Sequence, residues 1–169
     1  MAVLDVIKTR KSIRRYKDTP VEPEKLANVL EAARLAPSAR NLQDWKFIAV
    51  TDTEKRLALQ EACGGQRQVG QAPVTLVVCA NNDSVMSCGI SKTPIDCSIA
   101  MSFMLLQAEE EGLGMCWLGH FYADKVKEIL NIPEDYIVVA VSPLGYADED
   151  PAPKPRKAAE EVICYNEFK

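Results

Sequence analysis

The stretch TPIDCSIAMSFMLLQAEEEG, residues 93–112, constrains the fold more than any other part of this chain. Between Ile95 and Ala108 its side chains are apolar on nearly every side of a helix, and a helix of that kind is buried over most of its surface. The chain has 169 residues, of which 47% are hydrophobic, so it suits one compact domain with a core of its own. Such a domain has little room to cover this helix on all sides, so we expect a second subunit to cover part of it.

The other patterns alternate between helices and buried strands, which indicates an α+β or α/β layout. Helix signals mark residues 2–10, 23–36, 53–63 and 123–131, and strand signals mark residues 45–51, 73–80, 135–146 and 161–168. The polar stretch GGQRQVGQ, residues 64–71, is expected to be a loop. The last strand-like piece follows an exposed, Pro-rich connection, so it can add a strand to a partner's sheet.

Charge and composition exclude several classes of protein. The formal net charge of -4 argues against general nucleic-acid binding, because domains that bind nucleic acid are usually basic. No uncharged apolar run has spanning length and no signal peptide is recognisable, so we expect no membrane partner and a cytoplasmic location. The six cysteines and the single histidine, His120, lack metal-ligand spacing, so we expect no metal site. Four cysteines lie in apolar or helical stretches, which favours reduced, buried thiols, whereas Cys88 lies in a polar stretch and is expected to be exposed.

Two cationic segments are candidates for binding a phosphate. RKSIRRYKD, which begins at Arg10, carries five cations within eight residues, with Ser12 between Arg10 and Arg14. Two guanidinium groups and a hydroxyl can surround a phosphate, although the same residues can equally form a solvated basic face. In PKPRK, Lys154 and Arg156 lie on a proline-stiffened chain that points alternate side chains the same way. They can form the second half of a phosphate clamp, or a solvated tail.

Two further segments suit a flat ligand better than a phosphate. In PSARNLQDW, Asn41 and Gln43 offer donors and acceptors for the edge of a heteroaromatic ring, although the segment can equally be a helix cap and turn. In GLGMCWLGHF, glycines let the backbone approach a ligand closely, and a backbone amide near Leu118 or Gly119 could donate to a ring nitrogen. The glycine spacing is not G-x-G-x-x-G, and a tight turn is the alternative.

Four of these segments follow one another along the chain in a fixed order: RKSIRRY, APSARNLQDWKFIAV, GLGMCWLG and PKPRKAAEEVI. Together they closely resemble the nitroreductase family of FMN-dependent oxidoreductases. The resemblance extends from Val3 to about Tyr165. The resemblance implies an α+β fold in which helices flank a mixed sheet, with one FMN-binding domain over residues 1–169. It also implies an intertwined homodimer, in which a C-terminal segment of about residues 151–169 reaches the partner and FMN lies in clefts at the interface.

The resemblance also assigns cofactor contacts by position. The residues expected to hold the FMN phosphate and ribityl chain are Arg10, Ser12 and Arg14, with Lys154 and Arg156. The loop expected to reach the flavin from the other subunit contains Pro37, Ser38, Ala39, Asn41 and Gln43. The residues expected at the isoalloxazine edge are Trp117, Leu118 and Gly119. We include Lys11 among the cofactor contacts, although Lys11, like Arg15 and Lys17, can instead face solvent or pair with acidic neighbours. No catalytic side chain is assigned.

The chain departs from the family's pattern in three places. Many members carry an Asn and a Lys before the second strand, where this chain has GGQRQVGQ, so Gln66, Arg67 or Gln68 would have to replace them. We include Gln68 among the cofactor contacts for this reason. Leu118 stands where several members have an acidic residue, and Asp44 stands in place of the proline of a QPW motif.

The function that the resemblance implies is reduction of flat, electron-poor acceptors such as nitroaromatics, quinones or flavins. NADH or NADPH would supply the hydride in a ping-pong cycle. Two alternatives stay open: a flavin-binding storage or sensor protein without efficient turnover, and a nucleic-acid-binding domain that uses the basic segment at Arg10.

Overall fold

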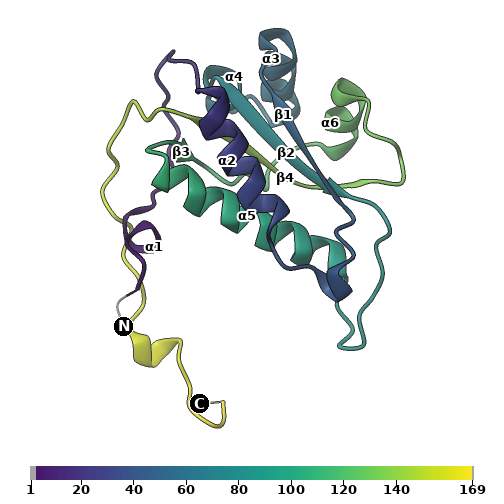
Figure 1. The fold of residues 1–169 in the computed structure, drawn as a ribbon, viewed down its shortest axis with the longest axis vertical. Coiled ribbons are helices and arrows are strands. Elements are labelled where there is room, and N and C mark those ends of the chain that lie inside the picture. Colours follow the sequence, from purple (N-terminus) through teal and green to yellow (C-terminus); the bar gives the residue numbers. More distant parts are fainter. Residues whose placement is uncertain (1–2, 169) are drawn as a thin grey trace.

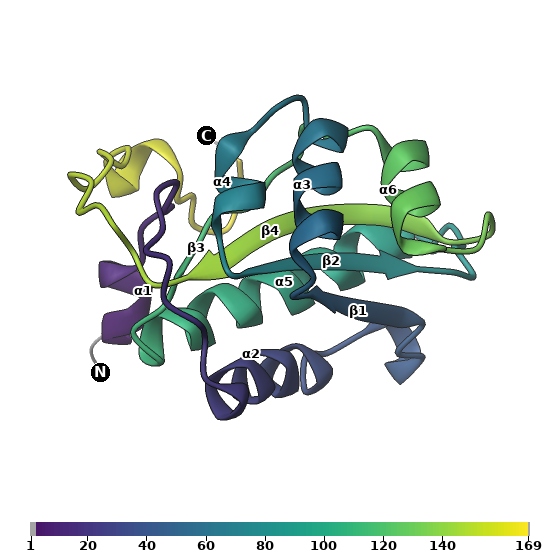
Figure 2. The same ribbon diagram turned by 90° about the horizontal axis from the view of Figure 1, so that it is seen from above.

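The computed structural model describes residues 3–168, which form three layers with a sheet in the middle (Figures 1 and 2). The four strands are β1 (Trp45–Val50), β2 (Val74–Ala80), β3 (Gly114–Met115) and β4 (Ile137–Gly145), in the order β1-β2-β4-β3. All neighbouring strands pair antiparallel, and one parallel bridge joins Ser12 to Met115. The expected α+β architecture is therefore confirmed.

Helices cover both faces of this sheet (Figure 2). One face carries α2 (Pro23–Arg34) and α5 (Lys92–Glu110), and the other carries α3 (Thr53–Ala62), α4 (Arg67–Gln71) and α6 (Ala123–Leu130). The remaining pieces are α1 (Asp5–Thr9) and two 3-10 turns, η1 (Ala39–Asn41) and η2 (Ala159–Glu161).

Strand β2 explains why the sheet has a core on each side. All seven of its residues are buried, and alternate side chains point to opposite faces of a strand. Leu76 and Val78 pack with α2 and α5, whereas Val77 and Cys79 pack with α3, α4 and α6. Fully burying each Leu or Val side chain contributes about 1.5–3 kcal/mol, so both helical layers are held by hydrophobic contact with the same strand.

Two expected elements are wrong in detail. Residues 64–71 are not all loop, because α4 forms there once Gly64 and Gly65, both with positive φ, have turned the chain at the end of α3. The helix has one fully buried apolar residue, Val69, and that is too little to leave a periodic signal in the sequence. Residues 161–168 form no strand within the described chain: the end of η2 is followed by turns and bends. A strand needs a neighbouring edge to pair with, and this segment lies away from the sheet (Figure 1).

Two apolar surfaces stay exposed on the single chain. On α5, Phe103 is 39% exposed, and Ile99 and Leu106 are only partly buried. In the C-terminal segment, Tyr165 is 78% and Phe168 is 97% exposed. Across residues 3–168, no helix combines the length and the hydropathy needed to cross a membrane.

Candidate functional site

Residues 10–17 run as an extended segment between β3 and the chain that leaves β4. The Ile13 amide donates to Met115 O at 3.1 Å, and the Lys17 amide donates to Tyr146 O at 2.9 Å. Ile13 packs against Gly114 so closely that a Cβ added at Gly114 would lie 2.5 Å from Ile13 Cγ1. Glycine at this position therefore lets the cationic segment lie flat on β3.

Tyr16 anchors the far end of this segment. Its side chain is 2% exposed, and its hydroxyl donates to Ile13 O at 2.6 Å and to Pro143 O at 3.3 Å. Burial raises the pKa of the Tyr16 phenol well above its usual value, so the hydroxyl stays protonated and remains a donor. Tyr16 thus fixes the backbone from which Ser12 and Arg14 project.

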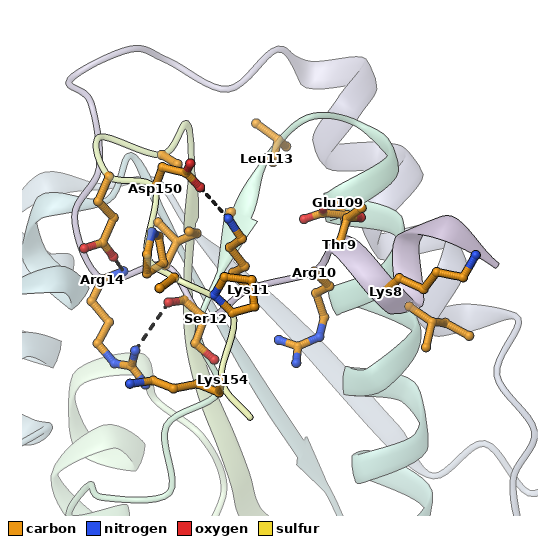
Figure 3. A pocket seen from close by; sticks show the side chains of 18 of the residues that line it. Lys8, Thr9, Arg10, Lys11, Ser12, Arg14, Glu109, Leu113, Asp150 and Lys154 are labelled. Carbon is orange, nitrogen blue, oxygen red and sulfur yellow. Dashed lines mark hydrogen bonds and ion pairs between the residues drawn. The ribbon is translucent and has the colours of Figure 1, made fainter. Parts of the chain in front are cut away.

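The cationic segment lines an open cavity of about 930 Å³ together with the chain that follows β4 (Figure 3). That volume is within the usual range of small-molecule sites, about 300–1,000 Å³. The charged residues that line it are six cations and three acids: Lys8, Arg10, Lys11, Arg14, Lys154 and Arg156, with Glu109, Glu149 and Asp150. The structure therefore brings together the two cationic segments that lie about 140 residues apart in the sequence.

Lys154 and Arg156 line the cavity, whereas Pro155 and Lys157 do not. Every residue from Glu149 to Lys154 also lines the cavity, so the cavity is lined continuously up to Lys154 and then by Arg156.

The cations of the cavity differ in how far they are already neutralised. Lys11 Nζ lies 2.5 Å from Asp150 Oδ1, so Lys11 has a carboxylate partner (Figure 3). Arg14 donates from its backbone to Glu149 Oε1 at 2.5 Å and from Nη1 to Ser12 O at 3.3 Å. Among the described residues, none makes a hydrogen bond or ion pair with the side chains of Arg10, Lys154 or Arg156.

This donor set fits the phosphate end of a nucleotide cofactor such as FMN. Three cations without a partner in the described chain, with Arg14 and the Ser12 hydroxyl beside them, can give a dianion several charge-assisted hydrogen bonds. Glu109 and Glu149 also line the cavity but were missed in the sequence, because nothing in their local pattern distinguishes them from solvated acids.

The second predicted contact segment, Pro37 to Gln43, is not part of this cavity. Its Ala39 amide donates to Asp96 near the start of α5, whereas Glu109 at the other end of α5 lines the cavity. Thirteen residues of helix separate these two positions, about 20 Å at 1.5 Å per residue. The structure therefore places Pro37, Ser38, Ala39, Asn41 and Gln43 away from the cationic cavity of their own chain.

The third segment, Trp117 to Gly119, also lies outside the cavity, and the structure restricts which of its amides is available. The Leu118 amide donates to Val141 O at 2.9 Å, as part of a bridge to β4, and the Leu118 side chain is buried. No residue in the range 3–168 accepts a hydrogen bond from the Gly119 amide, and the space beside Gly119 is open. Of the two amides that the sequence suggested as donors, only that of Gly119 is unused.

Gln66 links this segment to the turn before α4. Its Nε2 donates to Cys63 O and to His120 O, each at 3.0 Å, while its Oε1 accepts from Gln68 Nε2 at 3.0 Å. Gln68 is therefore held against Gln66, and neither residue lines the cationic cavity. The sequence left open whether Gln66, Arg67 or Gln68 has a role, and the structure gives Gln66 the clearest one, as the support of the loop at His120.

Known proteins are similar to this chain in both sequence and fold. The Nitroreductase family model matches residues 7–72 and 62–146. An NADH dehydrogenase of Thermus thermophilus is 33% identical, and the match covers 92% of this chain and 92% of the relative. FMN reductase [NAD(P)H] of Bacillus subtilis is 30% identical, and the match covers 95% of this chain and 72% of the relative.

A solved structure of an FMN-dependent nitroreductase from Clostridium difficile superposes with a TM-score of 0.81. It is 35% identical in sequence and covers 96% of this chain and 98% of its own. The matching family model spans most of the chain, and the relatives agree with it over nearly the full length. The chain therefore belongs to the nitroreductase family.

Proposed function

We propose that this FMN-dependent NAD(P)H oxidoreductase reduces flat, electron-poor acceptors, such as nitroaromatics, quinones or flavins, by ping-pong hydride transfer. The observation that carries the proposal is the cavity where Arg10, Lys154 and Arg156 converge without partners in the described chain. A nucleotide phosphate is the ligand whose charge and donor requirements match such a cluster. The nucleic-acid alternative has no such support, because the chain carries a net charge of -4.

In this proposal the phosphate end of FMN is held by Arg10, Ser12, Arg14, Lys154 and Arg156. Lys11 contributes by neutralising Asp150, which would otherwise repel the phosphate from the cavity wall. When bound, FMN supplies the chemistry, by accepting a hydride from the reduced nicotinamide and giving it to the acceptor.

The other proposed contacts come from loops that offer polar backbone and amide groups. The Gly119 amide donates to the flavin edge, and Gln66 holds the loop that presents it. Pro37, Ser38, Ala39, Asn41 and Gln43 reach the FMN of the partner subunit, because about 20 Å of α5 separates them from the cavity of their own chain. No side-chain general base is needed for hydride transfer.

A homodimer completes this arrangement. The exposed apolar face of α5 around Phe103 packs against the partner, and residues 151–169 extend to it as part of a single FMN-binding domain over residues 1–169. Tyr165 and Phe168 support this proposal, since large apolar side chains that are 78% and 97% exposed are typical of an interaction surface.

The visible spectrum of the purified protein tests the function. We expect a bound or reconstitutable flavin spectrum that bleaches when NADH or NADPH is added without oxygen and returns when a nitroaromatic or quinone is added. Protein that is colourless and cannot be reconstituted with FMN would contradict the proposal. Flavin that binds but is not rapidly reduced would favour the storage or sensor alternative.

The binding site is tested with the double variant Arg10→Ala and Arg156→Ala. Each charge-assisted hydrogen bond contributes about 1.5–3 kcal/mol, so we expect FMN to bind about 100-fold more weakly or worse. The matched control is Arg15→Ala with Lys157→Ala, which removes the same charge from residues outside the cavity. Equal FMN affinity in the two double variants would refute the phosphate site.

A further inference from the structure

The loop from Ser38 to Asp44 is held in an unusual backbone conformation. Arg40, Asn41 and Gln43 have φ values of 53°, 55° and 54°. Only asparagine among them adopts the left-handed region readily, so the chain must be held there by other contacts. The proposed role of this loop is to contact FMN, and its shape therefore matters to the cofactor.

Four amide hydrogen bonds fix the loop from within and from α5. The Asn41 amide donates to Ser38 O at 2.9 Å, and the Leu42 amide donates to Ala39 O at 3.1 Å. The Gln43 amide donates to Ser38 Oγ at 3.1 Å. The contact from outside the loop is made by Asp96, whose Oδ1 and Oδ2 lie 3.1 and 3.2 Å from the Ala39 nitrogen.

Asp96 is placed where its charge acts strongly. The residue is 8% exposed, and it lies one helical turn after Lys92 on α5. A carboxylate that is removed from water makes stronger hydrogen bonds than an exposed one, because the surrounding dielectric constant is low. The Ala39 amide is the described donor that satisfies it.

An ion pair with a buried lysine fixes the other end of the loop. Lys92 is 2% exposed, and its ammonium pairs with Asp44, the residue that stands where the family's motif has proline. Asp44 Oδ2 also accepts from Asn82 Nδ2 at 3.4 Å, and the Lys92 amide donates to Ser84 O at 3.0 Å. The first two turns of α5 thus hold both ends of the loop, through Lys92 at Asp44 and through Asp96 at Ala39.

We infer that Asp96 and the Lys92–Asp44 ion pair are positioning residues that hold residues 38–44 in the FMN-contacting conformation before FMN binds. This inference rests on the proposed placement of that loop beside the partner's FMN. A loop that is already ordered loses less entropy when the cofactor binds, so the affinity for FMN is higher. Without the anchors, a smaller fraction of the molecules has the loop in the FMN-binding conformation. The apparent affinity for FMN falls in proportion to that fraction.

The test uses Asp96→Asn and Lys92→Met in the full chain, with Val126→Ala on α6 as the control. Val126 is fully buried among α3, α4 and α6, so its truncation lowers stability without touching the loop. Hydrogen exchange of peptides that cover residues 38–44 is measured with and without FMN, and the dissociation constant of FMN is measured by flavin fluorescence.

We expect faster exchange of the loop amides and about tenfold weaker FMN binding in Asp96→Asn and in Lys92→Met. The control should lose thermal stability and keep both its loop exchange and its FMN affinity. Asp44→Asn combined with Lys92→Met should recover part of the stability lost in Asp44→Asn alone, because it leaves no unpaired buried ammonium.

Two results would overturn the inference, and they differ from failure of the proposed function. Unchanged loop exchange in both anchor variants would show that these residues do not order the loop. Faster loop exchange with unchanged FMN affinity would show that the loop is ordered by the anchors but has no part in binding FMN. A wild-type protein that binds no FMN would instead overturn the proposed function itself.

Discussion

At the scale of single residues, the backbone of Arg40 shows how far tertiary contacts override local preference. An arginine at φ 53° is in a region that costs most L-residues about 1–2 kcal/mol. Nothing in PSARNLQDW distinguishes that residue from its neighbours, so its conformation could not be predicted from the sequence. It follows from the anchors that α5 provides at Ala39 and Asp44.

A pair of substitutions at Arg40 measures this cost. Arg40→Gly and Arg40→Ala both remove the guanidinium side chain. The two variants therefore differ mainly in their tolerance of positive φ and in the entropy of the unfolded chain. We expect the glycine variant to be about 1 kcal/mol more stable than the alanine variant in urea unfolding. An alanine variant that is equally stable or more so would mean that the loop does not adopt positive φ in solution.

The phosphate-binding candidates were more predictable than the loop conformation. Arg10, Ser12 and Arg14 lie in a dense cationic segment and Lys154 and Arg156 in a second one, and charge of one sign gathered in two short segments is visible in the sequence. The sequence did not contain the information that Asp150 would pair with Lys11, or that the Leu118 amide would be used by Val141. The first contact depends on the path of the chain after β4, and the second depends on how the chain after β3 lies along β4.

At the scale of elements, helix α5 connects the loop at Ala39 with the cationic cavity. Asp96 near its start holds the loop at Ala39, its middle carries the apolar residues Ile99 and Phe103, and its last turn contributes Glu109 to the cavity. The sequence predicted the existence of this helix and its excess of apolar surface, because nineteen residues give a long and unambiguous signal. The short helix α4 could not be predicted in the same way, because its one buried valine produces no periodic pattern in the sequence. The C-terminal segment could not be predicted either, because the sequence does not show whether a strand has a neighbour to pair with.

The apolar face of α5 is tested with Phe103→Glu. A carboxylate placed in a packed subunit interface loses its water without gaining a partner, so we expect dimerisation to weaken roughly 100-fold or more. The matched control is Leu57→Glu on α3, where the leucine is 51% exposed. This variant should have the same mass in solution as the unmodified dimer. Analytical ultracentrifugation distinguishes the two, and a dimeric Phe103→Glu protein would exclude this face as the interface.

At the scale of the whole molecule, the two cores on either side of the sheet determine the chemistry of the cysteines. Cys63, Cys79, Cys97 and Cys116 are buried, whereas Cys88 and Cys164 are exposed. Burial raises the pKa of Cys63 and of Cys79 to about 11 and that of Cys97 to about 12. The expectation of buried thiols in the apolar stretches, and of an exposed Cys88, is therefore confirmed.

A thiol reagent should report this division directly. At pH 8 we expect Cys88 to react quickly in the native protein and the four buried thiols to react only after unfolding in guanidinium chloride. Mass spectrometry of labelled peptides identifies each site, and rapid native labelling of Cys63 or Cys97 would contradict the packing of the cores. Slower labelling of Cys164 than of Cys88 would support a C-terminal segment covered by the partner.

The same burial gives stability a pH dependence with a definite sign. The folded pKa values of these thiols lie above the value of about 8.5 for an unfolded cysteine. Their contribution is therefore complete below about pH 8.5 and is lost as the pH rises toward 11–12, so the urea midpoint should fall over that range.

The proposed placement of the two FMN-binding segments at opposite ends of α5 predicts that FMN occupancy depends on the protein concentration. If each FMN is held by Arg10 and Arg156 of one chain and by Asn41 and Gln43 of the other, then diluting the protein below its dimerisation constant releases flavin into solution. Conversely, excess FMN stabilises the assembly by mass action, by about 2.7 kcal/mol at a hundred times its dissociation constant. A cell that makes little of this protein would then regulate its activity through the supply of flavin as well as through the amount of polypeptide.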